Sequence, residues 1–253
     1  MELRRANDET TGPIIVFLPG IVAPAEIRYA ALVRELGGGV QAFTKDLEIY
    51  ESATPQQDYS IGEEVAGLAA AVDAAGVDRF FLYGHSAGGA ISLAFAGRHP
   101  DRLLGLALDE PASDYSAETK ATWARLLGPI QDLPAGERTP AFLAAQVAPE
   151  VKLPAPPPGS PPEWMGKRPA GIEAFMAAMD SYEDTGPLTY HGPVYYSHGS
   201  LSQPIWLGIR DRLASRFSNF TSEEYEGLHH MNTSHAAEPA RVAASLRRVW
   251  KLS

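Results

Sequence analysis

The sequence contains no cysteine, which excludes thiol nucleophiles, disulfides, CxxC redox pairs and cysteine-ligated zinc. It also lacks any run of lysine and arginine, and its formal net charge is −10, so it repels phosphate backbones and anionic membranes. No stretch approaches the ~18 consecutive apolar residues of a transmembrane helix, and the N-terminal segment lacks the apolar core of a signal peptide. We therefore expect a cytoplasmic protein, monomeric or homodimeric, that binds neither nucleic acid nor membranes.

What the chain does contain is the pattern of an α/β protein. Its 253 residues are 45% hydrophobic and 21% charged, as in an ordinary globular domain. Short continuous apolar runs predict buried parallel strands, and segments with helical periodicity separate them. This alternation predicts a doubly wound, mostly parallel sheet. Strands are predicted near residues 14–18, 40–43, 80–83, 104–108, 194–196 and 221–225, and helices near 24–36, 60–76, 87–98, 205–217 and 239–250.

The alternation stops after Pro111, and roughly 80 residues pass before the next predicted strand. Helices are predicted in this segment near 118–127 and 171–182. From Pro154 to Pro162, six of nine residues are proline, which predicts a polyproline-like surface loop. We therefore predict an α/β core, residues 1–111 and 191–253, and an inserted helical lid, residues 112–190.

Large apolar side chains are frequent in the predicted lid and could roof a pocket for a neutral, partly apolar substrate. The helical spacing of Phe175, Met176 and Met179 equally favours packing against the core. The full set is Trp123, Phe142, Trp164, Met165, Phe175, Met176 and Met179.

The string Gly84-His85-Ser86-Ala87-Gly88-Gly89 lies between a predicted strand and a predicted helix. Reversal from strand to helix within a few residues forces Ser86 into a strained conformation, and only small neighbours permit it. Such a turn exposes the hydroxyl at a helix N-terminus, where free N–H groups can stabilise a developing oxyanion. The pattern predicts that Ser86 is a nucleophile.

At these residues the sequence resembles the α/β-hydrolase superfamily, in particular its serine-hydrolase branch of esterases and lactonases. The resemblance covers the predicted core and implies an α/β-hydrolase fold, with the insertion where that family places a variable lid. It implies hydrolysis of a carboxylic ester or lactone of a small to medium, partly apolar molecule through an acyl-enzyme on Ser86. No HExxH spacing is present, so no metal or other cofactor is expected.

The resemblance also implies an oxyanion hole made by two backbone N–H groups, those of Ile21 and Ala87. Ile21 ends the string Leu18-Pro19-Gly20-Ile21, in which proline stands where the family commonly has histidine. Because the donor is a backbone group, that side chain can vary. The alternative is that Pro19-Gly20 is only a turn.

A serine hydroxyl needs a neighbouring base, and the chain has seven histidines. His85 lies inside the serine turn, and we expect its side chain to point away from the oxyanion side. Residues 227–235 stand where the family places its Gly-x-x-His histidine; that spacing favours His230 as the base, with His229 as the alternative. His235 is expected in a local hydrogen-bond network or at the pocket mouth. The other candidates, less well placed, are His99, His191 and His198.

The third residue should be a carboxylate that orients the histidine. Most members of the family place it as Gly-x-x-Asp after the strand that follows the lid, but the matching string from Gly199 to Ser202 contains no acid. Some members, haloalkane dehalogenases among them, place it after the strand that follows the nucleophile helix. Glu110 stands there, 24 residues beyond Ser86, and Asp109 is the alternative. Both could instead be solvated charges at a strand end.

Two other functions remain open at this point. The same three residues could cleave a thioester or a carbon–carbon bond, or transfer the acyl group to an acceptor other than water. The missing acid after Gly199 also permits a non-catalytic ligand receptor on the same fold.

Overall fold

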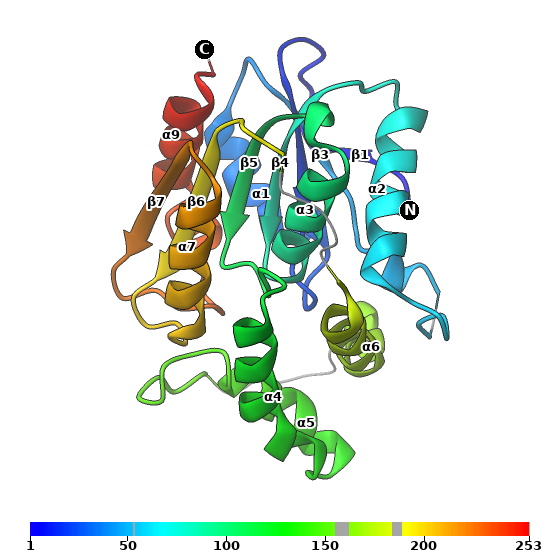
Figure 1. Cartoon of the computed structure of the whole chain (residues 1–253). Coiled ribbons are helices and arrows are strands. Elements are labelled where there is room, and N and C mark those ends of the chain that lie inside the picture. The colour runs from blue at the N-terminus through cyan, green and yellow to red at the C-terminus, as the bar shows by residue number, and fades with distance from the viewer. Residues whose placement is uncertain (53, 155–161, 184–188, 253) are drawn as a thin grey trace.

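A computed structural model describes residues 1–52, 54–154, 162–183 and 189–252 (Figure 1). One seven-stranded sheet has the order β1-β3-β2-β4-β5-β6-β7. Neighbouring strands are parallel, except that β1 pairs antiparallel with β3. The doubly wound, mostly parallel sheet is therefore confirmed. The strands are β1 (Arg4–Arg5), β2 (Ile14–Leu18), β3 (Gln41–Thr44), β4 (Phe80–His85), β5 (Leu103–Asp109), β6 (Val194–Gly199) and β7 (Phe220–Tyr225).

Helices cover both faces of the sheet. Apolar residues of α2, α3 and α7 form one core cluster with one face, and those of α1 and α9 form a second cluster with the other face (Figure 1). The bounds are α1 (Ala25–Leu36), η1 (Glu48–Tyr50), α2 (Ile61–Ala74), α3 (Ala87–Arg98), η2 (Pro100–Arg102), α7 (Ile205–Arg216), α8 (Ser234–Ala237) and α9 (Pro239–Trp250), where η marks a 3₁₀ turn.

The helix boundaries follow local chemistry. At the start of α2, the Ser60 hydroxyl accepts a hydrogen bond from the Glu63 N–H at 3.2 Å, and the Ser60 N–H donates to the Glu63 carboxylate at 3.1 Å. This reciprocal capping satisfies two N–H groups that a first helical turn leaves without partners.

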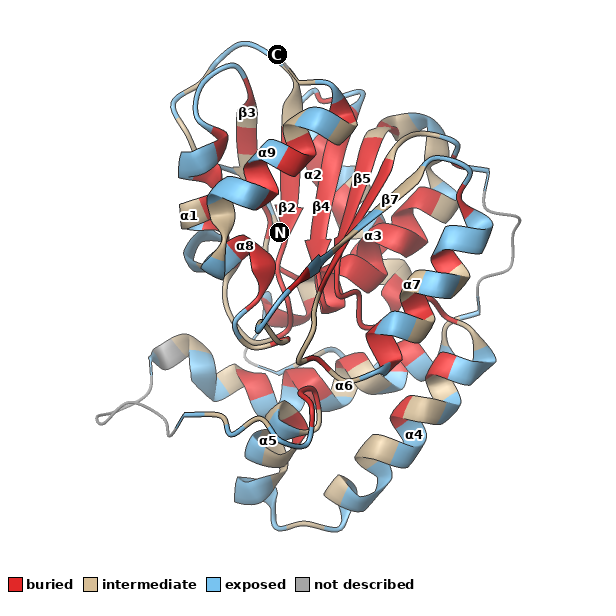
Figure 2. Cartoon of the chain, turned by 90° about the vertical axis from the view of Figure 1, so that its left-hand side faces the viewer, coloured by how far each residue is buried: buried red, intermediate tan, exposed pale blue. Residues whose placement is uncertain are grey.

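The centre of the sheet is the best buried part: every residue of β4 is buried, and α3 is buried from Ala87 to Ala96 (Figure 2). The turn between these two elements is therefore rigidly held.

The helices of the insertion lie beyond the carboxyl ends of the parallel strands (Figures 1 and 2). Of the helices predicted in the insertion, 118–127 falls within the helix Ala117–Gln131, and 171–182 overlaps the helix Arg168–Ser181 but extends one residue beyond its end. The helix α5 is not predicted, because Gly136 and Pro140 interrupt its pattern. The predicted polyproline loop lies mostly outside the described residues, and the division of the chain into core and lid stays a prediction. The elements are α4 (Ala117–Gln131), α5 (Ala135–Ala144), η3 (Glu163–Lys167) and α6 (Arg168–Ser181).

None of the helices in the described ranges combines the length and the apolar content that crossing a membrane requires.

Candidate active site

Ser86 occupies the turn between β4 and α3 with φ 52° and ψ −115°. A positive φ is unfavourable for a residue with a side chain, so close packing must hold it. Gly84 and Gly88 make that packing possible. A Cβ on Gly84 would overlap the Gly88 carbonyl and the Ser92 hydroxyl, and a Cβ on Gly88 would overlap the carbonyls of Leu18 and the next residue. The two glycines therefore allow the strand, the helix and the loop after β2 to converge on Ser86.

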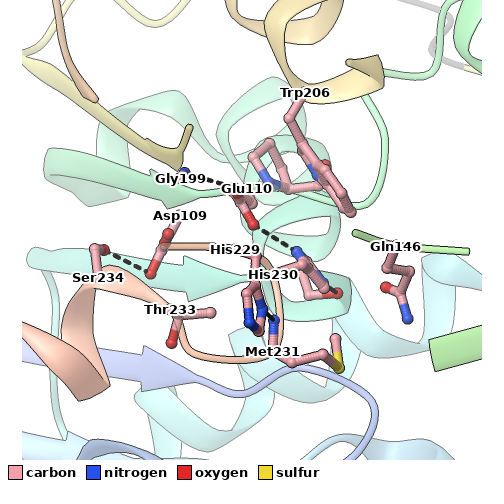
Figure 3. A network of polar contacts seen from close by, with 12 residues as sticks. Asp109, Glu110, Gln146, Gly199, Trp206, His229, His230, Met231, Thr233 and Ser234 are labelled. Carbon is pink, nitrogen blue, oxygen red and sulfur yellow. Dashed lines mark hydrogen bonds and ion pairs between the residues drawn. The ribbon is translucent and has the colours of Figure 1, made fainter. Parts of the chain in front are cut away.

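The structure brings the predicted base and acid to this serine. His230 Nδ1 lies 2.7 Å from a Glu110 carboxylate oxygen (Figure 3). His230 Nε2 lies 3.0 Å from the Ser86 hydroxyl. His230 and Glu110 are each 1% exposed, so bulk water does not compete for these contacts. The geometry fits a neutral imidazole that donates from Nδ1 to the carboxylate and accepts the serine proton at Nε2.

Glu110 stands directly after β5 with φ 44°, a second strained residue at the site. Its other carboxylate oxygen accepts a hydrogen bond from the Gly199 N–H at 2.8 Å (Figure 3). Gly199 ends β6, the neighbouring strand, at the position after which the resembled family usually carries its acid. The end of β6 therefore contributes a backbone N–H that binds the Glu110 carboxylate, and contributes no acidic side chain of its own.

The alternative residues have other partners. His229 is half-buried; its Nδ1 accepts a hydrogen bond from the Met231 N–H at 3.2 Å, and its own N–H donates to Asn232 at 2.6 Å. Burial lowers the pKa of His229 below its ordinary value. Of the histidine doublet, the structure brings only His230 to Ser86.

Asp109 pairs with His235 rather than with His230. His235 Nδ1 lies 2.5 Å from the Asp109 carboxylate, which also accepts hydrogen bonds from Tyr83 and Ser234, each at 3.1 Å. Burial works to raise the pKa of Asp109, but the hydrogen bonds, from His235 first, outweigh it, and the pKa lies below its ordinary value. Burial lowers the pKa of His235 to about 4. The pair is therefore a carboxylate and a neutral imidazole, inside the local network expected for His235.

The predicted oxyanion donors lie beside the serine turn. The Gly88 N–H donates to the Pro19 carbonyl at 3.0 Å, which joins the loop after β2 to the start of α3. A Cβ on Gly20 would stand 3.2 Å from the Ser86 Cβ, so this loop passes directly against the serine. Within the described part of the chain, the N–H groups of Ile21 and Ala87 have no recorded acceptor. Neither N–H group is therefore engaged by another described residue, and their role as oxyanion donors stays a prediction.

Two aromatic rings enclose His230, and the sequence indicates neither contact. Trp206 stacks on one side, with ring centres 4.2 Å apart and planes 12° apart, and its indole N–H donates to the Pro111 carbonyl at 3.1 Å. His85 stacks with a centre distance of 4.9 Å. Because Trp206 lies 24 residues before His230, no local motif could have revealed the stack.

The expected direction of the His85 side chain is wrong. A Cβ on Gly20 would lie 2.7 Å from His85 Nδ1, so the ring is tucked against the loop that carries Ile21. It fills the space between that loop, His230 and His235. Burial lowers the pKa of His85 well below its ordinary value, and neither ring nitrogen has a partner among the described residues. The ring is therefore neutral.

The remaining histidines lie away from the serine. His99 directly follows α3, as expected, and its ring packs on Phe95. His198 contacts Glu224 at 3.2 Å, and His191 is exposed. In the ranges that the structure describes, no three histidine or acidic side chains are grouped to hold a metal ion.

Comparisons with solved structures give close matches to the fold. A hydrolase from Pseudomonas aeruginosa has a TM-score of 0.73 at 15% identity, covering 98% of this chain and 92% of that one. A thermophilic esterase from Thermogutta terrifontis has a TM-score of 0.70 at 21% identity, covering 97% and 92%. The enol-lactonase from Burkholderia xenovorans has a TM-score of 0.63 at 16% identity, covering 96% and 95%. At these identities the likeness concerns the fold.

A search of curated proteins finds no match to this chain. A family model does match: the model for the alpha/beta hydrolase fold covers residues 13–144, which is more than half of the 253 residues and includes β2 through α5. With the sheet order and the strained serine between β4 and α3, this match shows that the chain belongs to the alpha/beta hydrolase fold family.

Proposed function

We propose that the protein is a serine hydrolase that cleaves a carboxylic ester or lactone of a small to medium, partly apolar substrate through an acyl-enzyme on Ser86. The observation that carries the proposal is the continuous contact from the Ser86 hydroxyl through His230 to Glu110, at 3.0 and 2.7 Å, with all three side chains buried. A histidine oriented by a carboxylate is what makes a serine hydroxyl nucleophilic at neutral pH.

The proposed reaction has two similar halves. Ser86 Oγ bonds to the carbonyl carbon while His230 Nε2 takes the hydroxyl proton, and the carbonyl electron pair moves to oxygen, where the N–H groups of Ile21 and Ala87 stabilise it. When this intermediate collapses, the bond to the leaving alkoxide breaks and His230 returns the proton to it. Water then attacks the acyl-enzyme in the same way and releases the acid and Ser86. Glu110 keeps Nδ1 protonated and stabilises the imidazolium.

The position of Glu110 supports an active site over a receptor. The receptor hypothesis rests on the missing acid after Gly199. In the structure Glu110 reaches His230 from the adjacent strand end, and the Gly199 N–H binds the same carboxylate at 2.8 Å. This arrangement weakens the reason for proposing a receptor.

The insertion supports a partly apolar substrate. A cavity of about 870 Å³ lies between α4, α5 and α6, within the size range of pockets that bind small molecules. Its walls include Trp123, Phe142, Ile172, Met176 and Met179. Trp123 in turn meets the edge of Trp206, the ring stacked on His230, at a centre distance of 5.9 Å. An apolar chain attached to a carbonyl at Ser86 would have this cavity close by.

An active-site phosphonate and a set of chromogenic esters and lactones test the proposal. The phosphonate should label Ser86 and no other residue, and S86A should lose both the label and turnover. Unchanged turnover by S86A would contradict the proposal. Transfer of the acyl group to added alcohol or thiol in preference to water would instead indicate an acyltransferase, and thioester and carbon–carbon substrates belong in the same panel.

A further inference from the structure

Residues 18–21, called the oxyanion loop below, are held by their carbonyl groups. Three of these four carbonyls accept hydrogen bonds from three different parts of the chain, whereas the Ile21 N–H has no recorded acceptor among the described residues. The Ile21 N–H lies in the same peptide plane as the Gly20 carbonyl, and the carbonyls of the peptide units directly before and after that plane, those of Pro19 and Ile21, are both held. Because the peptide unit is planar, holding its two neighbours limits its rotation and so restrains the direction of the Ile21 N–H. The donors are the Tyr29 hydroxyl to Leu18 at 2.5 Å, the Gly88 N–H to Pro19 at 3.0 Å and the Tyr50 hydroxyl to Ile21 at 2.8 Å.

Two of these donors belong to helices packed on the sheet, and the third, Tyr50, touches the insertion. Tyr50 ends the η1 turn, and its ring lies under the guanidinium of Arg168, the first residue of α6, with the Arg168 carbon 3.7 Å from the ring centre. Arg168 is only 5% exposed, so this cation–π contact is sheltered from water.

The backbone of α6 comes equally close to Tyr50. A Cβ on Gly171 would overlap the ring and hydroxyl of Tyr50, so the helix can lie flush against the ring only because this residue is glycine. Just before α6, the Lys167 ammonium donates to the Tyr50 carbonyl at 3.3 Å. Three contacts near the start of α6 therefore hold Tyr50: Arg168 on the face of its ring, Gly171 against its ring and hydroxyl, and Lys167 at its backbone carbonyl.

We propose that Tyr50 is a positioning residue that couples α6 to the oxyanion loop: when α6 is seated on Tyr50, the tyrosine hydroxyl holds the Ile21 carbonyl. This carbonyl belongs to the peptide unit directly after the one that carries the Ile21 N–H, so holding it limits rotation of that N–H away from Ser86. This proposal rests on the proposed function, since it assigns the Ile21 N–H to the oxyanion. Tyr50 itself does not touch the reacting atoms.

The proposal predicts an effect on chemistry rather than on substrate affinity. A donor to the oxyanion acts mainly in the transition state, so misalignment lowers kcat and leaves KM largely unchanged. Y50F keeps the ring under Arg168 and removes one hydrogen bond, which should lower kcat roughly two- to tenfold. R168M should lower kcat in the same direction. Because Arg168 acts through the tyrosine hydroxyl, R168M should have little further effect in the Y50F background.

G171A adds a third, independent test. Alanine is the better helix former, so α6 itself should not be weakened. The added methyl group, however, must push α6 or Tyr50 away, and kcat should fall more than in Y50F.

The matched controls are Y59F and R98M. Tyr59 is another tyrosine near η1, but its hydroxyl donates to Glu64 at 2.9 Å. Arg98 makes a cation–π contact with Tyr182, 5.4 Å from the ring centre, and does not contact the oxyanion loop. Both variants should keep the wild-type kcat. An unchanged kcat in Y50F would overturn the catalytic role of the Ile21 N–H, and additive losses in Y50F/R168M would overturn the coupling of Arg168 to the loop through Tyr50.

Hydrogen exchange provides a readout that does not depend on turnover. Amides of the oxyanion loop should exchange faster in Y50F, R168M and G171A than in wild type, and at the wild-type rate in Y59F and R98M. Unchanged exchange in all variants overturns the coupling itself. If the wild type is active and the loop amides of Y50F, R168M and G171A exchange faster, but the kcat of these variants is unchanged, only the catalytic role of the Ile21 N–H is overturned. If S86A remains active, it is the proposed function that fails, and exchange still decides the coupling.

Discussion

Two of the residues proposed to form the active site, Ser86 and Glu110, are held in conformations that they would not adopt in isolation. Ser86 and Glu110 have φ angles of 52° and 44°, each at the carboxyl end of a strand in the buried centre of the sheet. Backbone strain of this kind costs on the order of 1–3 kcal/mol per residue and persists only where the surroundings enforce it. Here it turns the Ser86 hydroxyl and the Glu110 carboxylate towards the same imidazole.

The adjacent acids Asp109 and Glu110 should respond differently to the same loss of charge. E110Q should lower kcat roughly 10³- to 10⁴-fold, because His230 loses the acceptor that fixes its tautomer. D109N should mainly lower the melting temperature, because Asp109 holds His235 and Ser234 rather than His230. Steady-state kinetics and thermal denaturation of both variants check this. Equal kcat losses would contradict the assignment of Glu110.

The histidine doublet gives an equally direct comparison. H230A should lower kcat roughly 10⁴-fold or more, because Ser86 loses its base. H229A should keep nearly the wild-type kcat, since among the described residues the His229 ring bonds to the Met231 N–H and not to Ser86. The reverse result, with H229A inactive and H230A active, would show that the loop rearranges around substrate.

At the scale of whole elements, the helices of the insertion do not fill the space between them. The cavity lies among α4, α5 and α6, and polar contacts bridge its sides, from Lys120 to the carbonyls of Asp180 and Tyr182 and from Arg138 to Glu173. The space is partly open to solvent and lined by apolar side chains of all three helices, which fits the binding of a small molecule.

Filling this cavity should change substrate length preference. A124W places an indole on the cavity wall, so hydrolysis of long-chain esters should fall while hydrolysis of acetate esters stays at the wild-type rate. A121W is the matched control, because Ala121 is also an exposed alanine of α4 but does not line the cavity. The ratio of kcat/KM for long and short esters checks this prediction. A parallel loss in both variants would exclude the cavity as a substrate site.

Local sequence patterns were sufficient for most elements and for Ser86. The apolar runs of β2, β4 and β5 and the glycines around Ser86 act within a few residues, so one sequence reveals them. The expectations for His230 and Glu110 depended on family resemblance. Contacts such as Tyr50 with Arg168, Trp206 with His230 and Asp109 with His235 join distant segments, and no local pattern encodes them. The short α5 was missed because its own residues favour a turn.

For the molecule as a whole, the pair Asp109–His235 makes stability depend on pH. The pKa of His235 falls through burial from 6.5 to about 4. Between these values the unfolded chain binds a proton that the folded protein does not, so the free energy of unfolding decreases as the pH falls from 6.5 to 4, by up to about 3 kcal/mol. The pKa of Asp109 lies below 3.8, so its contribution is lost only below that pH.

Denaturant titrations followed by circular dichroism test this dependence. Wild type should lose stability between about pH 7 and about pH 5. H235N should lose less, because an amide can donate to Asp109 without titrating. H191N is the control, since His191 is exposed, and should behave like wild type. If H235N loses as much stability as wild type over this pH range, the pH dependence arises from other groups, and His85 is the first to test.

The ring contacts from Trp123 through Trp206 to His230 also make the unlabelled protein an optical reporter. Two of its four tryptophans lie on this path, one at the cavity wall and one stacked on the histidine. A protonated imidazole quenches a stacked indole, so emission from Trp206 should report the charge on His230. Emission from Trp123 should shift when an apolar ligand displaces water from the cavity. With W123F and W206F, ligand entry and proton transfer can be timed separately by fluorescence in the same molecule.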